Sequence, residues 1–118
     1  MGQDDEEILK RLSQAAAGLL FMSESDYRFE LILWAGPKEL TPDFIRSITG
    51  ETEDCPVQEL EVEDVLSAGR YQRLLMALQS QLSNLKAYKV GRINMPVYLV
   101  GRSREGSWLG LSTRVVET

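Results

Sequence analysis

The sequence predicts an α+β fold, a layered sandwich in which helices cover a β-sheet. Three observations support this prediction. Apolar residues recur at helical spacing in two long segments, about residues 5–21 and 68–85. Short apolar runs that read as strands lie between and after these segments. The length of 118 residues, with 43% hydrophobic and 26% charged residues, is typical of one globular domain, so we expect a single domain over residues 1–118.

The first helix is predicted from about Asp5 to Phe21, with acidic residues near the positive end of the helix dipole. Its apolar positions are Ile8, Leu9, Leu12, Ala16, Leu19 and Leu20. The run Ser-Glu-Ser-Asp that follows favours caps and turns, so we expect an exposed connection that carries Glu24. A buried strand is predicted over residues 29–34, ended by a Gly-Pro pair.

A second, short helix is predicted to begin after Thr41, whose hydroxyl can cap a helix that has proline in its first turn. It should run to about Ile48 and be closed by Gly50. Residues 57–62 predict a strand, and the long second apolar segment predicts a helix from about Ala68.

The rest of the chain predicts β-structure. The expected strands cover residues 88–93, 97–101 and 108–116, and residues 104–107 supply the turn between the last two. The last strand reaches almost to the end of the chain, which can hold the terminal carboxylate in place.

The net charge of −5 conceals an asymmetry. Residues 1–64 hold 16 acidic and 5 basic residues, whereas residues 65–118 hold 2 and 8. One interpretation is that these are solvated faces whose opposite charges attract each other in the folded chain. Another is that the acidic half steers the protein toward a basic partner surface. We expect no nucleic-acid binding, because no basic stripe with interleaved aromatic residues occurs.

The residue types argue against an enzyme. The sequence has no histidine, which removes the commonest general base and the Ser-His and Cys-His pairs. It has no phosphate loop or dinucleotide fingerprint. Glu61 and Glu63 alternate as on a solvated strand face. The lone Cys55 cannot form an internal disulfide and is expected to pack as a small apolar residue. We therefore expect no catalytic residues, no cofactor and no metal of the protein's own.

We expect no membrane span and no export signal in this chain. No apolar run reaches the roughly 18 residues of a membrane span, and the start is acidic where a signal peptide would be positive. We expect a cytoplasmic protein that does not bind membranes and is monomeric when free.

Glu24 and Thr118 are the candidate binding residues. In one interpretation Ser23 and Ser25 form a cap or turn, and Glu24 is an incidental solvated side chain. In the other, Glu24 is presented to a partner, where its carboxylate can ligate a hard cation or pair with arginine. The carboxylate of Thr118, on a terminal strand, would be a second oxygen donor.

Two blocks of the sequence resemble the cyanobacterial nuclease A inhibitor family. The first is Leu-Leu-Phe-Met-Ser-Glu-Ser over residues 19–25, followed by Tyr27, Phe29 and Leu33-Trp34. The second is Val-Tyr-Leu-Val-Gly over residues 97–101 with Leu-Ser-Thr-Arg-Val-Val-Glu-Thr over residues 111–118. The likeness covers nearly the whole chain.

This resemblance implies a three-layer α/β/α sandwich, with a mixed or antiparallel sheet, that plugs the active site of a magnesium-dependent, sugar-non-specific nuclease. It implies that Glu24, flanked by Ser23 and Ser25, and the carboxylate of Thr118 reach the metal centre of the nuclease. There the carboxylate oxygens would stand in for the phosphate oxygens of the substrate.

The chain departs from this family in one place. Between the acidic strand and the long helix, the family's inhibitor has a longer acidic loop, with an aspartate and a tryptophan that look like further contacts. Here the stretch runs only from Asp64 to Tyr71, and neither contact carries over. An interaction or regulatory domain of the same fold with a non-nuclease partner therefore stays open as the alternative.

Overall fold

A computed structural model describes residues 3–22, 26–34, 39–50, 55–92 and 94–116. The elements, in chain order, are α1 (Gln3–Ala16), β1 (Leu20–Met22), β2 (Asp26–Arg28), β3 (Glu30–Trp34), α2 (Pro42–Thr49), β4 (Val57–Leu60), α3 (Val62–Val65), the 3₁₀ turn η1 (Gly69–Tyr71), α4 (Gln72–Gln81), β5 (Ser83–Val90), β6 (Asn94–Arg102) and β7 (Trp108–Val116).

The centre of the fold is a five-stranded sheet with the strand order β3-β7-β6-β5-β4. Every neighbouring pair in this sheet is antiparallel. The strands β1 and β2 form a separate antiparallel hairpin. The predicted α+β class is confirmed, and of the two sheets that were expected, mixed or antiparallel, the structure has the antiparallel one.

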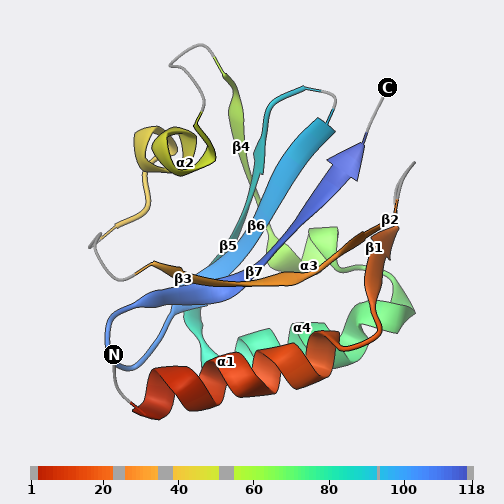
Figure 1. Ribbon diagram of the computed structural model, residues 1–118, viewed down its shortest axis with the longest axis vertical. Helices are drawn as coiled ribbons and strands as arrows, with labels where there is room; N and C mark the ends of the chain where they lie inside the picture. Colours follow the sequence, from red (N-terminus) through yellow and green to blue (C-terminus); the bar gives the residue numbers. More distant parts are fainter. Residues whose placement is uncertain (1–2, 23–25, 35–38, 51–54, 93, 117–118) are drawn as a thin grey trace.

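Helices pack on both faces of the sheet (Figure 1). Since side chains alternate along a strand, β6 contributes Leu99 to the core under α1 and α4 and Val100 to the core under α2. Leu12, Leu74 and Leu78 bring helical residues into the first core, and Ile45 of α2 enters the second. The arrangement is that of an α/β/α sandwich. Cys55 is buried in the second core, as expected.

The prediction for the first helix was wrong at its C-terminal end. Helix α1 stops at Ala16, five residues before the predicted boundary, and Leu20 and Phe21 belong to strand β1. Gly18, with φ of +77°, reverses the chain in the left-handed conformation that favours glycine. The Leu19 amide donates to the Ala16 carbonyl at 3.0 Å, which closes this turn.

The strand predicted over residues 29–34 is present as β3, but it is not a buried strand. It lies at one edge of the sheet, and only Ile32 is buried, whereas Leu31 is 47% and Leu33 is 39% exposed. The Gly36-Pro37 pair that was predicted to end it lies outside the described residues.

The second helix forms as predicted. In α2 the Thr41 hydroxyl accepts a hydrogen bond from the Phe44 amide at 3.2 Å, and Pro42 occupies the first turn. The helix ends at Thr49, and Gly50, with φ of 80°, closes it through bonds to the carbonyls of Arg46 and Ser47.

The long helix is shorter than predicted, because α4 ends at Gln81 and β5 already begins at Ser83. Leu82, the cap residue between α4 and β5, is extended and buried, and Leu85 packs against the same core from β5.

Strand β4 ends at Leu60, two residues before the predicted end. The expectation that Glu61 and Glu63 lie on a strand face is therefore wrong, because Glu61 is the N-cap residue of α3 and Glu63 lies in that helix. The predicted strand over residues 108–116 matches β7 at both ends, and residues 104–106 form the turn before it. None of the described helices is long and apolar enough to cross a membrane.

Candidate partner-binding surface

The four residues predicted to bind a partner, Ser23, Glu24, Ser25 and Thr118, lie outside the described residues. The residues on either side of them are described. Met22 and Asp26 are paired across the β1–β2 hairpin. At the other end of the chain, Val116 is the last residue of β7 and pairs with Asn94.

The hairpin is attached to the C-terminal strand. The Thr113 hydroxyl of β7 donates to the Tyr27 carbonyl of β2 at 3.4 Å, and both β1 and β2 contact β7. Because β3 and β7 are antiparallel, tracing the chain back from Glu30 into β2 follows β7 toward Val116. Figure 1 shows the hairpin and the end of β7 at the same end of the molecule. The strands that flank both predicted carboxylates are therefore in contact and end on the same side of the molecule.

A groove opens beside this junction, on the face of the sheet that carries α2. Pairing across β6, β7 and β3 sets residues in rows. The row Val100–Gly110–Ile32 lies in the core under α2, and the next row is Tyr98–Ser112–Glu30. Tyr98 marks the border of the helix, because its hydroxyl lies 3.1 Å from the Thr49 hydroxyl. Past Tyr98, where α2 no longer covers the sheet, the groove opens over the strands.

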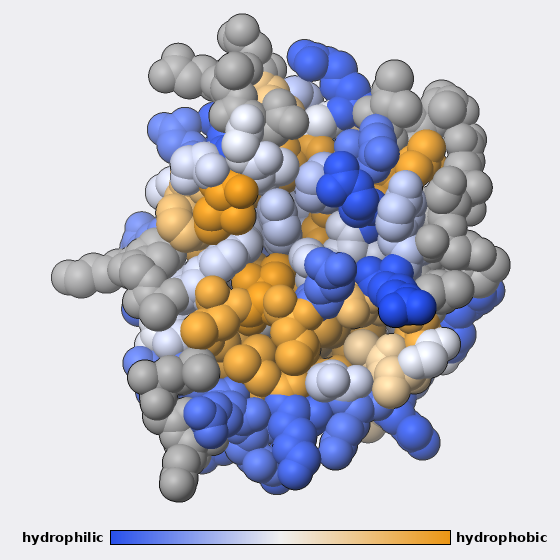
Figure 2. Space-filling view, in the orientation of Figure 1, coloured by the Kyte–Doolittle hydropathy of each residue, from blue (hydrophilic) through white to orange (hydrophobic). Residues whose placement is uncertain are grey.

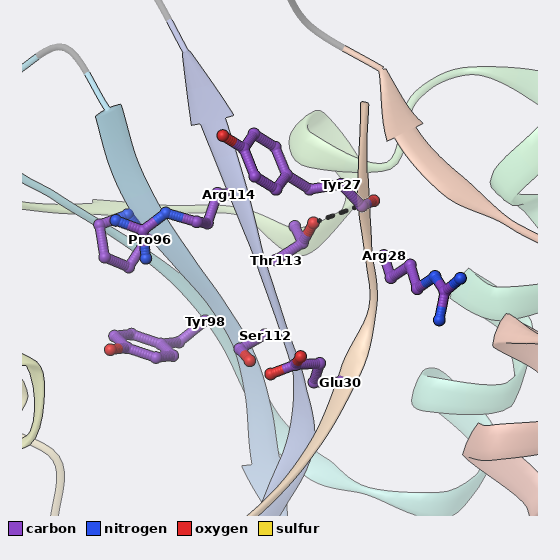
Figure 3. A pocket seen from close by; sticks show the side chains of 8 residues that line it. All are labelled: Tyr27, Arg28, Glu30, Pro96, Tyr98, Ser112, Thr113 and Arg114. Atoms are coloured by element: carbon purple, nitrogen blue, oxygen red, sulfur yellow. Dashed lines mark hydrogen bonds between the residues drawn. The ribbon is translucent and has the colours of Figure 1, made fainter. Parts of the chain in front are cut away.

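The groove has a volume of about 390 Å³. Its lining residues are Tyr27, Arg28, Glu30, Pro96, Tyr98, Ser112, Thr113 and Arg114 (Figure 3). Ser112 lies in the centre of the floor, and its short side chain leaves space between the larger residues around it.

The charges in the groove are separated. The Glu30 carboxylate points toward Ser112 (Figure 3), and among the described residues it has no hydrogen-bond or ion-pair partner. At the other end, Arg114 is tied to Asn94 by a 3.0 Å hydrogen bond from its Nε. The Arg28 side chain leaves the backbone on the side opposite the Tyr27 ring.

A second, more apolar hollow of about 520 Å³ lies between the C-terminal end of α1 and β3. Arg28 lines both hollows, and the second one also includes Leu19, Phe29 and Leu31. Figure 2 shows apolar surface gathered between β3 and α1. Leu31 lines this hollow, and the partly exposed Leu33, two positions further along β3, faces the same side of the sheet.

Sequence reasoning missed the hairpin and the groove. The hairpin had a local signal: Gly18, then two short apolar or aromatic stretches separated by Ser-Glu-Ser. This signal was overlooked because Leu19 and Leu20 continue the apolar spacing of the first helix, which was therefore predicted to include them. The groove had no local signal, because it depends on which residues of three strands are paired.

The ion pairs give partial support to attraction between the two halves of the chain. Lys86 of the basic half pairs with Glu59 of the acidic half at 3.2 Å, and the Tyr88 hydroxyl also donates to Glu59 at 3.4 Å. Burial, and after it the adjacent Glu59 carboxylate, raise the pKa of Tyr88 to about 12. The other two described pairs, Arg11–Glu7 and Arg46–Asp43, lie within the acidic half.

The connection from Asp64 to Tyr71 is compact. Helix α3 ends at Val65, and Leu66 and Tyr71 are both buried. The Tyr71 ring packs edge-to-face on Phe29, with ring centroids 6.1 Å apart. Tyr71 is therefore a core residue and presents no aromatic contact to a partner. Within the described ranges, no group of three or more Cys, Asp or Glu residues could hold a metal ion.

The family model for nuclease A inhibitor-like protein matches this chain over residues 6–68 and 63–118. The two matched segments overlap at residues 63–68, in and beside α3. The overlap falls within the connection from Asp64 to Tyr71 and the end of α3. No curated protein matches the chain.

Proposed function

The chain belongs to the nuclease A inhibitor-like family, and on this premise we propose that it inhibits a magnesium-dependent, sugar-non-specific nuclease by plugging the active site. The proposed contacts are Glu24, with Ser23 and Ser25 beside it, and the terminal carboxylate of Thr118. The protein acts by binding, without catalysis, and supplies no metal. Its carboxylate oxygens take the place of phosphate oxygens at the metal of the nuclease.

The observation that carries this proposal is the junction between the hairpin and β7. A small catalytic cleft admits two carboxylates only if they approach from the same side. The hydrogen bond from Thr113 to Tyr27 holds β2 on β7, three positions before Val116 on one strand and one position after Asp26 on the other. This supports a common position for the segments that carry Glu24 and Thr118.

The charge distribution supports the same proposal. A nuclease that binds nucleic acid presents a basic cleft, and the excess of acidic residues in the first half of this chain would accelerate encounter with it. Neutralising Glu51 or Glu53 should then slow association and reduce its dependence on salt, with little effect on dissociation.

The alternative is an interaction or regulatory role with a partner that is not a nuclease. The compact connection from Asp64 to Tyr71 favours it, since this is where the family's longer acidic loop would add contacts. Such a protein would retain the fold of the family but would bind a different class of partner.

The deciding experiment titrates the purified protein into nuclease A and a panel of other magnesium-dependent, sugar-non-specific nucleases. Inhibition at a one-to-one ratio, independent of DNA or RNA as substrate, supports the inhibitor. If no nuclease in the panel is inhibited at micromolar concentration of the protein, the non-nuclease partner becomes the better account.

A further inference from the structure

We propose that the groove over Ser112 receives an arginine side chain of the nuclease, whose guanidinium pairs with the Glu30 carboxylate and packs against the Tyr98 ring. This inference rests on the proposed function and adds a third contact to it. Glu30 and Tyr98 come from β3 and β6, outside the segments that carry the two presented carboxylates.

The shape of the groove follows from strand pairing. Tyr98 pairs with Ser112 and Ser112 pairs with Glu30, so the three side chains form one row across the sheet. A serine between a tyrosine and a glutamate leaves a hollow with an aromatic side and an anionic side. The volume of about 390 Å³ accommodates one long side chain. Helix α2 does not close the hollow, because it ends at Thr49, the residue that meets the Tyr98 hydroxyl.

The charge of the occupant follows from Glu30. Its carboxylate lies in the groove without a partner among the described residues, although Arg28 and Arg114 both line the groove. Arg114 is tied to Asn94 at the far end, and Arg28 leaves the chain on the other side (Figure 3). At the Glu30 end of the groove an anion would be repelled and a cationic side chain would pair with the carboxylate, whereas Arg114 makes the Pro96 end cationic.

Arginine fits this site better than lysine. Its planar guanidinium stacks on aromatic faces and binds a carboxylate through two parallel hydrogen bonds. The groove offers both: the Tyr98 and Tyr27 rings at its sides, and Glu30 beside its floor (Figure 3). Arginine is also a residue that a phosphodiester-binding cleft carries for its substrate.

The position of the groove ties it to the proposed interface. Tyr27 in its wall belongs to the hairpin, and Arg114 lies two positions before the end of β7. One side of a standard protein interface buries about 800 Å². A partner that meets the end of β7 and the hairpin at this scale also covers the adjoining groove.

The experiment compares Glu30→Gln and Ser112→Leu with the parent as inhibitors of nuclease A. The first keeps the size of the side chain and removes its charge; the second fills the hollow and leaves the charge. Glu6→Gln is the matched control, because Glu6 is exposed on α1, which packs on the opposite face of the sheet from the groove. This substitution changes the net charge by the same amount as Glu30→Gln. Thermal melts establish that each variant is folded.

We expect both groove variants to raise the inhibition constant by about tenfold, mainly through faster dissociation, and Glu6→Gln to change it by less than about twofold. If Glu30→Gln and Ser112→Leu inhibit as well as the parent, the groove is not a contact, while the proposed function stands. If the parent itself inhibits no nuclease, the proposed function fails and this inference fails with it.

Discussion

Thr113 and Tyr27, which are 86 positions apart in the chain, are joined by a hydrogen bond of 3.4 Å from the threonine hydroxyl to the tyrosine carbonyl. Thr113 is only 5% exposed, and the bond is partly buried. It links the hairpin near the N-terminus to the C-terminal strand. The relative position of these two segments is the part of the fold on which the proposed inhibition depends.

Replacing Thr113 by Val should loosen this link with little change in shape. The Tyr27 carbonyl loses its partner, so we expect the free energy of unfolding to fall by about 1 kcal/mol in urea denaturation. Hydrogen exchange of the hairpin amides should accelerate more than exchange in β5 and β6. Thr113→Ser keeps the hydroxyl and is the control. Equal exchange in the parent and Thr113→Val would show that the hairpin is held by other contacts.

The stability of the protein should fall at high pH because of Tyr88. Its pKa is raised to about 12 from an ordinary value of 10.0, chiefly by burial and then by Glu59. The folded state therefore favours the protonated phenol, and this contribution is complete below pH 10 and is lost as pH rises from 10 through 12. The loss should reach about 2–3 kcal/mol.

Urea denaturation of the parent and of Tyr88→Phe at pH 9, 10.5 and 11.5 isolates this effect, because lysines titrate equally in both proteins. The difference in unfolding free energy between the two proteins should change with pH in the stated direction. A difference that is constant from pH 9 to 11.5 would mean that Tyr88 titrates at its ordinary pKa.

Gly110 should tolerate no side chain. A Cβ atom added there would lie 1.8 Å from the Leu99 carbonyl oxygen on the neighbouring strand. We expect Gly110→Ala to lower the free energy of unfolding by about 3 kcal/mol or more, since the central strands must separate. Gly69→Ala is the control, because no atom lies within 4 Å of its added Cβ. Similar melting temperatures for the two variants would contradict the close approach of β7 and β6.

Several elements could be predicted from the sequence because their signals are local. The Thr41 cap, Pro42 and Gly50 defined α2, and strand β7 was predicted at both ends. The ends of α1 and α4 were predicted too late, because Leu19 and Leu20, and then Leu82 and Leu85, continue the helical spacing. The structure places Leu20 in β1 and Leu85 in β5. Leu19, Leu82 and Leu85 pack in or against one core from positions outside the helices. Apolar periodicity reports burial and does not report where a helix stops.

The candidate site also has parts that could be predicted from local sequence and parts that could not. The Ser-Glu-Ser block and the terminal strand can be read in the sequence. The attachment of strand β2 to β7 cannot, because it follows only from the pairing of β7 with β3 and the bond between Thr113 and Tyr27. The groove that contains Glu30 depends on the register of three strands, so no local sequence pattern could predict it. The pairing of strands that are distant in the chain positions these residues, and this pairing cannot be read from a single sequence.

The most direct test of the account measures inhibition by Glu24→Gln and by a form with one residue added after Thr118. The first removes a charge at constant size, and the second displaces the terminal carboxylate. With a nuclease that the parent inhibits, we expect each variant to raise the inhibition constant by about tenfold or more, about 1.4 kcal/mol. Glu6→Gln, on α1, should leave it unchanged. If both variants inhibit as well as the parent, the carboxylates do not reach the metal centre, and the active-site plug is wrong.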